Sequence, residues 1–372
     1  MERLGVRSQT LYAYVSRGRV RAEPDPTEPR RSRYRASDVA ALTARKARSR
    51  KVMDVASSAI AWGEPVLASA ITTTVDGRLF YRGRDAVLLA ETETLEAVAR
   101  LLRGGHGVAL KVVERPAPPR GGTMRERAFA ALADRAGIDA PARGRAPLAL
   151  AAEAATLLDM LTDAVAGVTS GGAIHERLGR AWGQGPRGWD LIRRALVLLA
   201  DHELNASTFA ARVAASTGAS LSAAALAGLC ALSGPLHGGM AARVKALIQE
   251  AERIGAEAAV DARIAQGSPL PGFGHQLYPD TDPRAEALLA ALGATGPLED
   301  LRLAAERAGG RRVNIDFALV AMGETLRLPD DAPFMLFAVA RCAGWIAHAL
   351  EQMQTGELIR PRARYVGAEP EA

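Results

Sequence analysis

One histidine, His237, lies in the glycine-rich segment 234–239 (Gly-Pro-Leu-His-Gly-Gly), which separates an apolar, Ala-rich stretch from the start of a helical pattern. The first N–H groups of a helix are unpaired and the helix dipole is positive there, so an imidazole at this position stays neutral and serves as a hydrogen-bond donor. A histidine in a glycine turn can equally well cap the helix or hold the turn. Two later polar segments, 271–275 with 282–285 and 313–317, make chemical sense as its partners. We therefore expect these segments to meet in one site.

A second chemical signal is an arginine inside an apolar helix. Residues 334–350 predict a helix that is apolar on nearly all sides and therefore buried in a helical core, with Arg341 in its middle. Leaving a buried charge without its partner costs on the order of 3–5 kcal/mol. Arg341 therefore needs either an internal carboxylate or an anionic ligand.

The elements that position these residues are predicted to be mostly helices. β-branched residues around Asp76-Gly77 predict one short hairpin. Amphipathic or apolar patterns predict helices over the following residues: 85–103, 148–166, 189–204, 220–232 and from about 240 onward. Residues 104–147 are rich in Gly, Pro and Arg; we assign them no function, and His106 is interpreted as a loop residue.

Taken together, these motifs resemble those of the citrate synthase family. The resemblance is carried, in order along the chain, by residues 234–239, 272–275, 282–285, 314–317, 344–348 and 360–362. Five separate motifs in the right order, followed by the arginine pair, are far less frequent by chance than any one of them. The hairpin also resembles the N-terminal hairpin of that family.

The resemblance implies an all-α fold of two domains, the smaller of which closes over the substrate. By this resemblance the large domain comprises residues 46–239 and 322–372, the small domain comprises residues 240–321, and a small N-terminal module precedes them. The implied reaction condenses acetyl-CoA with oxaloacetate to give citrate and CoA. It needs no metal and no cofactor.

By the same resemblance, Asp316 is the general base, His237 donates to the thioester carbonyl, and His275 donates to the oxo group of the second substrate. The apolar neighbours of Asp316, Ile315 and Phe317, should desolvate its carboxyl group and raise its pKa. The implied ligands of the substrate carboxylates are His202, Arg284, Arg341 and Arg360. The family arginine at Arg360 reaches the site of a partner subunit, which implies a homodimer.

Two histidines carry alternative interpretations. His202 could instead be a helix-terminal residue paired with Asp201 or Glu203. His348, although it lies in a family motif, is interpreted as structural. Asp282-Pro283 should cap a helix and fix the origin of the Arg284 side chain.

Departures from the family pattern leave the substrate and the function class open. Gln276 replaces the usual arginine after His275, and residues 318–320 (Ala-Leu-Val) replace the usual Tyr-Ser-Gly beside the base. A 2-methylcitrate synthase that uses propionyl-CoA is therefore one alternative. Another is a DNA-binding regulator that senses metabolites on the same fold without turnover.

The N-terminal 45 residues resemble the winged helix-turn-helix of excisionase and MerR-like proteins, although the first helix is nearly absent before Leu4. Residues 1–50 hold 13 Lys and Arg against 5 Asp and Glu, whereas the rest holds 34 against 36. Such an asymmetry points to duplex DNA as a partner. The candidate DNA contacts are Arg7, Gln9, Tyr12, Arg17, Arg30, Arg31, Arg33 and Arg35. A solvated basic arm that packs on the main domain is the alternative.

Composition bounds the class of protein. The chain has 372 residues, 48% apolar but only 5% aromatic, and is long enough for a large core. No charge-free apolar run is long enough to span a membrane, and the first residues lack a signal-peptide core. We expect a cytoplasmic protein without membrane contact, in which Cys230 and Cys342 stay reduced and packed.

Overall fold

The computed structural model divides the chain into two compact units, Met1–Ala68 and Ser69–Ala372. The structure describes residues 11, 15–16, 20–26, 28, 32–39, 67–104, 115–293, 295–309, 312–363 and 365–368. Each unit is described by itself.

In the N-terminal unit, strands β1 (Ala22–Pro24) and β2 (Ser32–Tyr34) form an antiparallel hairpin, with Ala22 opposite Tyr34. Leu11 is buried. A hairpin is the form that the wing of a winged helix-turn-helix takes, but the module itself stays a prediction. Residues 36–39, which follow the hairpin, are helical. Most of the two helices predicted before the hairpin lies outside the described residues, as do the candidate contacts Arg7, Gln9, Tyr12, Arg17, Arg30 and Arg31.

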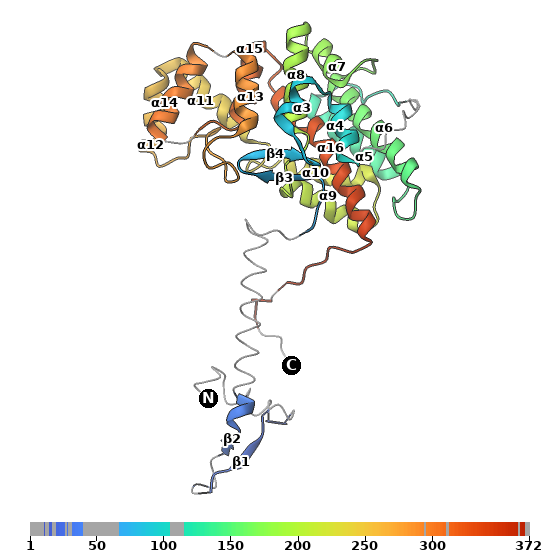
Figure 1. The fold of residues 1–372 in the computed structure, drawn as a ribbon, viewed down its shortest axis with the longest axis vertical. Coiled ribbons are helices and arrows are strands. Elements are labelled where there is room, and N and C mark those ends of the chain that lie inside the picture. The colour runs from blue at the N-terminus through green and yellow to red at the C-terminus, as the bar shows by residue number, and fades with distance from the viewer. Residues whose placement is uncertain are drawn as a thin grey trace. The chain divides into compact units, whose positions relative to one another are not determined.

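The larger unit is built from helices and one small sheet (Figure 1). Its strands are β3 (Thr72–Val75), β4 (Arg78–Tyr81) and β5 (Arg84–Asp85). The helices are α3 (Ala86–Thr92), α4 (Leu95–Leu102), α5 (Met124–Ile138), α6 (Pro147–Ala166), α7 (Ile174–Ala181), α8 (Pro186–Leu199), α9 (Ala206–Ser216), α10 (Leu221–Leu232), α11 (Met240–Ile254), α12 (Ala256–Ala265), α13 (Pro283–Leu292), α14 (Pro297–Gly309), α15 (Ile315–Leu326) and α16 (Ala332–Thr355).

The predicted hairpin is confirmed. Asp76 and Gly77 both have positive φ, 51° and 71°, which suits the tight turns that join two twisted strands. From β4, the buried Tyr81 places its hydroxyl group within 3.2 Å of the carbonyl oxygens of Val197, Leu198 and Asp201. The hairpin is thereby fastened to the C-terminal end of α8.

Two predicted helices have different bounds. The single helix predicted over residues 85–103 is two helices, because Glu93 is extended and the Thr94 side chain caps α4 by accepting from the Ala97 N–H at 3.3 Å. The helix predicted over residues 189–204 ends at Leu199, since Asn205 caps a new helix, α9. The polar residues that follow Leu199 are therefore in a loop, which can reach a site.

Helix α16 is the centre of the core and confirms the buried helix predicted over residues 334–350. It packs against α4, α6, α8, α9 and α10. Among the described residues it is the one helix long and apolar enough to cross a membrane, but 94% of its apolar window is buried within the protein, as expected for a core helix. A Cβ atom at Gly228 of α10 would lie 2.6 Å from the Trp345 ring, so these two helices pack closely only with glycine there.

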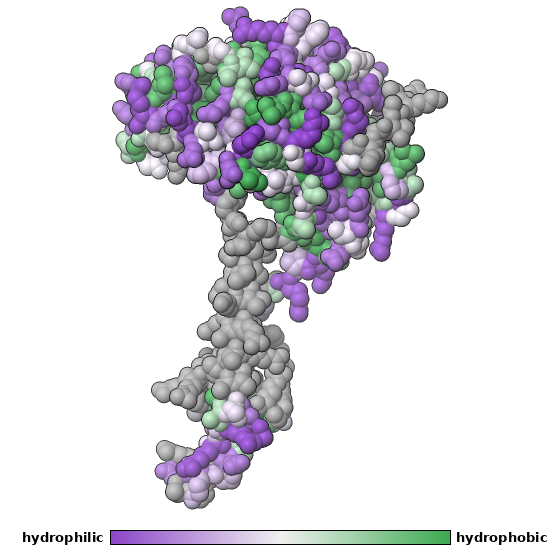
Figure 2. Space-filling model, viewed as in Figure 1, coloured by the Kyte–Doolittle hydropathy of each residue, from purple (hydrophilic) through white to green (hydrophobic). Residues whose placement is uncertain are grey.

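Helices α11 to α15 form a second group, seen beside the first in Figure 1, in which α11 packs on α12, α14 and α15 and α13 packs on α15. Helices α13 and α15 also contact α8 of the first group. Hydrophilic residues cover much of the surface of the second group in Figure 2. This grouping resembles the predicted division at residues 240–321, whose boundaries remain a prediction.

The two cysteines differ. Cys342 is buried in α16, as expected, but Cys230 is exposed. The expectation for Cys230 was wrong because α10 turns the face that carries it outward even though the helix is apolar all round.

Candidate functional site

The turn that carries His237 joins α10 to α11 and depends on glycine. A Cβ atom at Gly238 would lie 2.6 Å from the carbonyl oxygen of Leu232, and one at Gly239 would lie 2.7 Å from the Cα of Pro235. The predicted glycine-rich break between two helices is therefore confirmed. Burial, aided by the positive charge of Arg341, lowers the pKa of His237 to about 4, so the imidazole is neutral at pH 7. The predicted neutrality holds, with burial as its main cause.

The side chain of His237 is held by a serine that sequence reasoning missed. Its Nε2 lies 2.9 Å from Ser207 Oγ, which also lies 3.1 Å from the indole nitrogen of Trp345 and 2.7 Å from Asn205 Oδ1. The indole N–H can only donate, so Ser207 accepts from Trp345. Ser207 donates its proton to Asn205 Oδ1, which can only accept, so in this arrangement His237 donates from Nε2 to Ser207 Oγ. If the serine proton turns to His237 Nε2 instead, the imidazole carries its own proton on Nδ1.

His275 lies in a loop with a defined tautomer. Its Nδ1 accepts the backbone N–H of Leu277 at 3.1 Å, so the proton of the neutral ring is on Nε2. Burial, together with the charge of Arg284, lowers the pKa of His275 to about 4. The ring meets that of His202 edge to face, with centroids 5.1 Å apart. His275 is thus a neutral donor through Nε2.

Backbone pairing joins the loop of His275 to the segment of Asp316. The Gly274 N–H donates to the Arg312 carbonyl at 2.8 Å, and the Asn314 N–H donates to the Gly272 carbonyl at 2.9 Å. Gly272 has φ 86°, and a Cβ atom there would lie 3.0 Å from Phe317 and from Val244, so the approach needs glycine. The second and third motifs are neighbours in space, as expected.

Asp316 lies in the first turn of α15, which Asn314 caps by accepting the Asp316 N–H at 3.0 Å. Desolvation of the carboxyl group raises the pKa of Asp316 to about 6. The direction agrees with the expectation from its apolar neighbours, and the adjoining Phe317 is indeed buried. Such a carboxylate is a stronger base than an exposed one and is still ionised at pH 7.

Arg284 is tied to the cap of its own helix. Asp282 caps α13, as predicted, and accepts from Arg284 Nε at 2.9 Å and Nη2 at 2.8 Å. The same carboxylate accepts the Ile315 N–H at 3.0 Å. Asp282 thereby fixes both the guanidinium group and the start of the helix that carries Asp316.

Arg341 is buried, with 1% exposure, and forms no ion pair with a carboxylate in the part of the chain that the structure describes. Its Nε donates to the Leu199 carbonyl at 3.0 Å, while Nη2 is buried and has no hydrogen-bond partner among the described residues. Burial lowers its pKa to about 10. The buried Asp201 acts on Arg341 electrostatically but forms no ion pair with it in the described chain. The free Nη2 therefore favours an anionic ligand as its partner.

The alternative interpretation of His202 is wrong, because neither neighbouring carboxylate binds it. Asp201 Oδ2 lies 3.1 Å from Nε2 of His348, and Glu203 accepts the Thr74 N–H. His202 Nε2 instead lies 2.9 Å from the hydroxyl oxygen of Tyr278. Burial, followed by the charges of Arg284 and Arg341, holds the pKa of His202 well below its usual value. His348 has the structural position that we expected.

Arg360 is not brought to this cluster. It lies in the extended, exposed chain after α16. The structure therefore assembles His202, His237, His275, Asp316, Arg284 and Arg341 from five separate segments, without Arg360.

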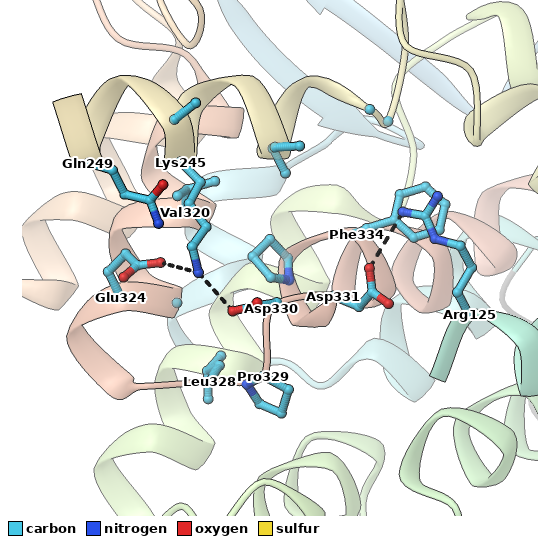
Figure 3. A pocket seen from close by; sticks show the side chains of 17 residues that line it. Arg125, Lys245, Gln249, Val320, Glu324, Leu328, Pro329, Asp330, Asp331 and Phe334 are labelled. Carbon is cyan, nitrogen blue, oxygen red and sulfur yellow. Dashed lines mark hydrogen bonds and ion pairs between the residues drawn. The ribbon is translucent and has the colours of Figure 1, made fainter. Parts of the chain in front are cut away.

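A cavity of about 340 Å³ lies beside the cluster but contains none of the predicted site residues (Figure 3). It is lined by α11, the end of α15, the start of α16 and Arg125. Lys245 pairs there with Glu324 at 3.1 Å and Asp330 at 2.8 Å, and Arg125 pairs with Asp331 at 3.7 Å. Its charged groups are already matched, in contrast to Arg341. Within the described residues, no three His, Cys, Asp or Glu side chains converge as metal ligands.

The fold and the cluster define a class: helical proteins that place a desolvated carboxylate beside neutral imidazole donors and buried guanidinium groups. Residues 122–362 match the family described as citrate synthase, C-terminal domain, and the chain belongs to this family.

Relatives with known names support this assignment. The chain is 41% identical over 198 residues to putative citrate synthase 2 of Mycobacterium tuberculosis, covering 50% of this chain and 53% of that protein. It is 40% identical over 185 residues to citrate synthase of Haloferax volcanii, covering 46% and 49%. It is 33% identical over 187 residues to 2-methylcitrate synthase of Shewanella oneidensis, covering 47% and 50%. The chain thus spans about half the length of the curated relatives that it matches.

Solved structures extend the likeness over more of the fold. Citrate synthase from Thermotoga maritima superposes with a TM-score of 0.69 at 26% identity, covering 83% of this chain and 96% of that one. The ternary complex of carboxymethyl coenzyme A and oxaloacetate with citrate synthase from Thermoplasma acidophilum superposes with a TM-score of 0.68 at 24% identity, covering 83% of this chain and 95% of that one. The second likeness shows the fold alone.

Proposed function

We propose that this protein condenses acetyl-CoA with oxaloacetate to give citrate and CoA. The observation that carries the proposal is the unpartnered, buried Nη2 of Arg341 in the same cluster as the desolvated carboxyl group of Asp316. A carboxylate substrate would neutralise the first group, and the second is suited to remove a carbon-bound proton. The names of the relatives agree with this reaction.

In the first step, Asp316 removes a proton from the methyl group of the acyl thioester. The enolate oxygen that results needs a hydrogen-bond donor, which His237 supplies through Nδ1 when Ser207 donates to its Nε2. A neutral imidazole is a weaker hydrogen-bond donor than an imidazolium cation, but its acidity is close to that of the enol. Ser207 and Trp345 thus fix the ring that stabilises the enol.

In the second step, the enol carbon attacks the oxo carbon of oxaloacetate. His275 donates from Nε2 to the oxo oxygen, because Leu277 occupies its Nδ1. The developing alkoxide is stabilised there and takes up a proton, giving citryl-CoA. Water then cleaves the thioester bond, which releases CoA.

The carboxylates of oxaloacetate are bound by His202, Arg284 and Arg341 in this proposal. Planar guanidinium groups bind carboxylates through two parallel hydrogen bonds. Arg360 completes the set from the partner subunit of a homodimer, which agrees with its exposed position away from the cluster of its own chain. The small domain, residues 240–321, closes on the large domain, residues 46–239 and 322–372, and excludes water during enolisation.

Propionyl-CoA is the alternative acyl substrate, since a 2-methylcitrate synthase is among the relatives. The wall beside the base differs from the family pattern at residues 318–320, which are buried in α15. Comparing the kcat/KM of the two acyl-CoA substrates decides between them. One added methylene group is worth about 10–200-fold in such a pocket.

The test of the function is the release of CoA thiol from acetyl-CoA when oxaloacetate is added to the purified full chain. We expect release that requires oxaloacetate and saturates with it. Oxaloacetate binding without thiol release from either acyl-CoA would instead support the metabolite-sensing regulator.

We propose duplex DNA as a second partner, bound by a winged helix-turn-helix module at residues 1–45. The β1–β2 hairpin and the helical residues 36–39 that follow it support this proposal. Among the predicted contacts, Arg35 is exposed, whereas Arg33 is paired with Asp25 at 2.8 Å, which weakens its case as a phosphate contact.

Titration of labelled duplexes tests the module in the full chain. Replacing Arg30, Arg31 and Arg35 by Ala should weaken binding and reduce its salt dependence, because fewer counterions are released. Replacing the exposed Arg243 and Arg253 is the matched control. Equal binding by the two variants would show that the N-terminal segment is not the DNA contact.

A further inference from the structure

Tyr278 has no role among the residues considered so far, yet it touches three of them. It lies three residues after His275 in the loop before α13 and is 2% exposed. Its hydroxyl oxygen lies 2.9 Å from Nε2 of His202, in the loop between α8 and α9. One side chain therefore bridges the α11–α15 part of the chain and the helices around α16.

The ring of Tyr278 packs on the second histidine of the site. The ring centroids of Tyr278 and His275 are 4.9 Å apart at an interplanar angle of 38°, and the Tyr278 N–H donates to the His275 carbonyl at 3.3 Å. The guanidinium carbon of Arg284 lies 5.3 Å from the centre of the Tyr278 ring, within the range of a cation–π contact. Rotation of the ring would therefore disturb His275 and Arg284 together.

The hydroxyl group has a function that the ring alone cannot supply. A buried phenol needs a hydrogen-bond partner, and here the partner is a histidine that is itself buried. Phenylalanine would keep the packing on His275 and Arg284 but would leave His202 without this contact. Packing and hydrogen bonding can thus be separated by a single substitution.

We infer that Tyr278 is a positioning residue for the oxaloacetate site, which holds the loop of the His275 donor in register with His202. The inference rests on the proposed function. Oxaloacetate has an oxo group and two carboxylates, and the donors assigned to them come from both parts of the chain that Tyr278 joins. The hydrogen bond preorganises these donors before the substrate arrives.

The first test is Tyr278→Phe in the full-length protein. Losing one neutral hydrogen bond should raise the KM for oxaloacetate roughly three- to tenfold. The KM for acetyl-CoA should stay within about twofold, since the contacts of Tyr278 with His202, His275 and Arg284 are with residues assigned to oxaloacetate. Tyr34→Phe, which removes a hydroxyl group from the N-terminal unit, is the matched control and should change neither constant. A Tyr278→Phe enzyme with wild-type KM for oxaloacetate overturns the inference.

A double-mutant cycle shows whether Tyr278 acts through His202. His202→Asn removes the Nε2 end of the ring, and oxaloacetate binding is measured by calorimetry for both single variants and the double variant. If the hydroxyl group acts through His202, adding Tyr278→Phe to His202→Asn should weaken binding by less than about twofold. Full additivity would contradict the inference. A wild-type protein that binds no oxaloacetate would overturn the proposed function as well, whereas normal wild-type binding with an unaffected variant would overturn the inference alone.

Discussion

Two of the buried charged clusters in the described chain differ in how their arginines are neutralised. Arg177 of α7 is 2% exposed and pairs with both Asp159 and Asp163, while Arg115 pairs with the same two carboxylates at 3.1 and 3.2 Å. Arg341 of α16 is equally buried, yet within the described chain it has only the Leu199 carbonyl and the face of the Phe337 ring. In the first cluster every arginine is paired with carboxylates, whereas in the second the guanidinium group of Arg341 forms no ion pair.

This difference separates structure from function. A buried charge is tolerated when it is paired, and removing one partner is strongly destabilising. The cluster of Arg177 therefore needs no ligand to complete its charge pairing. A cluster that leaves a guanidinium nitrogen unpaired lowers stability until an anion arrives, which is a common property of binding sites.

The largest expected effect concerns the carboxylate of the incomplete cluster. Asp316→Asn keeps the shape of the side chain but removes the proton acceptor, so turnover should fall by roughly 10²–10⁴-fold. Thiol release measures turnover, and calorimetry should find oxaloacetate binding little changed. Because a raised pKa means that ionised Asp316 lowers stability above pH 6, the variant should melt no lower than the wild type. Activity within a few-fold of wild type would show that the base is misassigned.

Arginine-to-methionine substitutions in the two clusters should have opposite effects on stability. Arg177→Met leaves Arg115 as the one remaining ion-pair partner of Asp159 and Asp163 among the described residues, and it should lower the free energy of unfolding by up to about 3–5 kcal/mol. Arg341→Met removes a buried charge that forms no ion pair in the described chain and should leave the ligand-free protein as stable as the wild type, or more so. Urea unfolding without substrates measures both. If both variants were destabilised equally, the proposed difference between the two clusters would be wrong.

The pH dependence sharpens the same contrast. The carboxylate of Asp316 must be ionised to act, and its pKa is raised to about 6 by desolvation. Turnover should therefore be constant above pH 7 and fall about tenfold per pH unit well below pH 6. His237 and His275, with pKa values lowered to about 4, remain neutral throughout this window. If turnover fell near pH 4 instead of near pH 6, Asp316 would not be desolvated during the reaction.

The smallest effect is expected at the cavity of Figure 3, where charges are paired but partly exposed. Lys245, Glu324 and Asp330 have side-chain exposures of 29%, 38% and 89%. Exposed ion pairs contribute about 0–1 kcal/mol, so Lys245→Met should change the free energy of unfolding by less than about 1 kcal/mol. Thiol release should stay near the wild-type rate. A large loss of either quantity would give this cavity a role that the paired charges do not indicate.

Sequence alone predicted the parts of the site that depend on local chemistry. The break around His237, the cap at Asp282 and the desolvation of Asp316 each follow from residues within a few positions. Ser207 and Tyr278 could not be found in this way, because their partners His237 and His202 lie 30 and 76 positions away. The same applies to Tyr81, whose hydroxyl group contacts the end of α8, more than a hundred positions away.

The errors in the fold have local causes that the periodicity of apolar residues does not reveal. The helix predicted over residues 85–103 is interrupted because Thr94 can cap a helix, although the apolar pattern continues across it. Helix α8 ends early because Asn205 caps the next helix. Polar capping residues hardly change the apolar periodicity from which helices are predicted, but they determine where the loop that carries His202 begins.

The most direct test of the account is the binding of oxaloacetate, without acyl-CoA, to the wild type and to Arg341→Met and Arg177→Met. If the unpaired guanidinium group of Arg341 is the site of a substrate carboxylate, calorimetry should show saturable binding by the wild type and by whatever fraction of Arg177→Met is folded. Arg341→Met should bind at least about 30-fold more weakly, since a charge-assisted, buried contact of about 2 kcal/mol or more is lost. Equal affinity of the wild type and Arg341→Met would contradict the account.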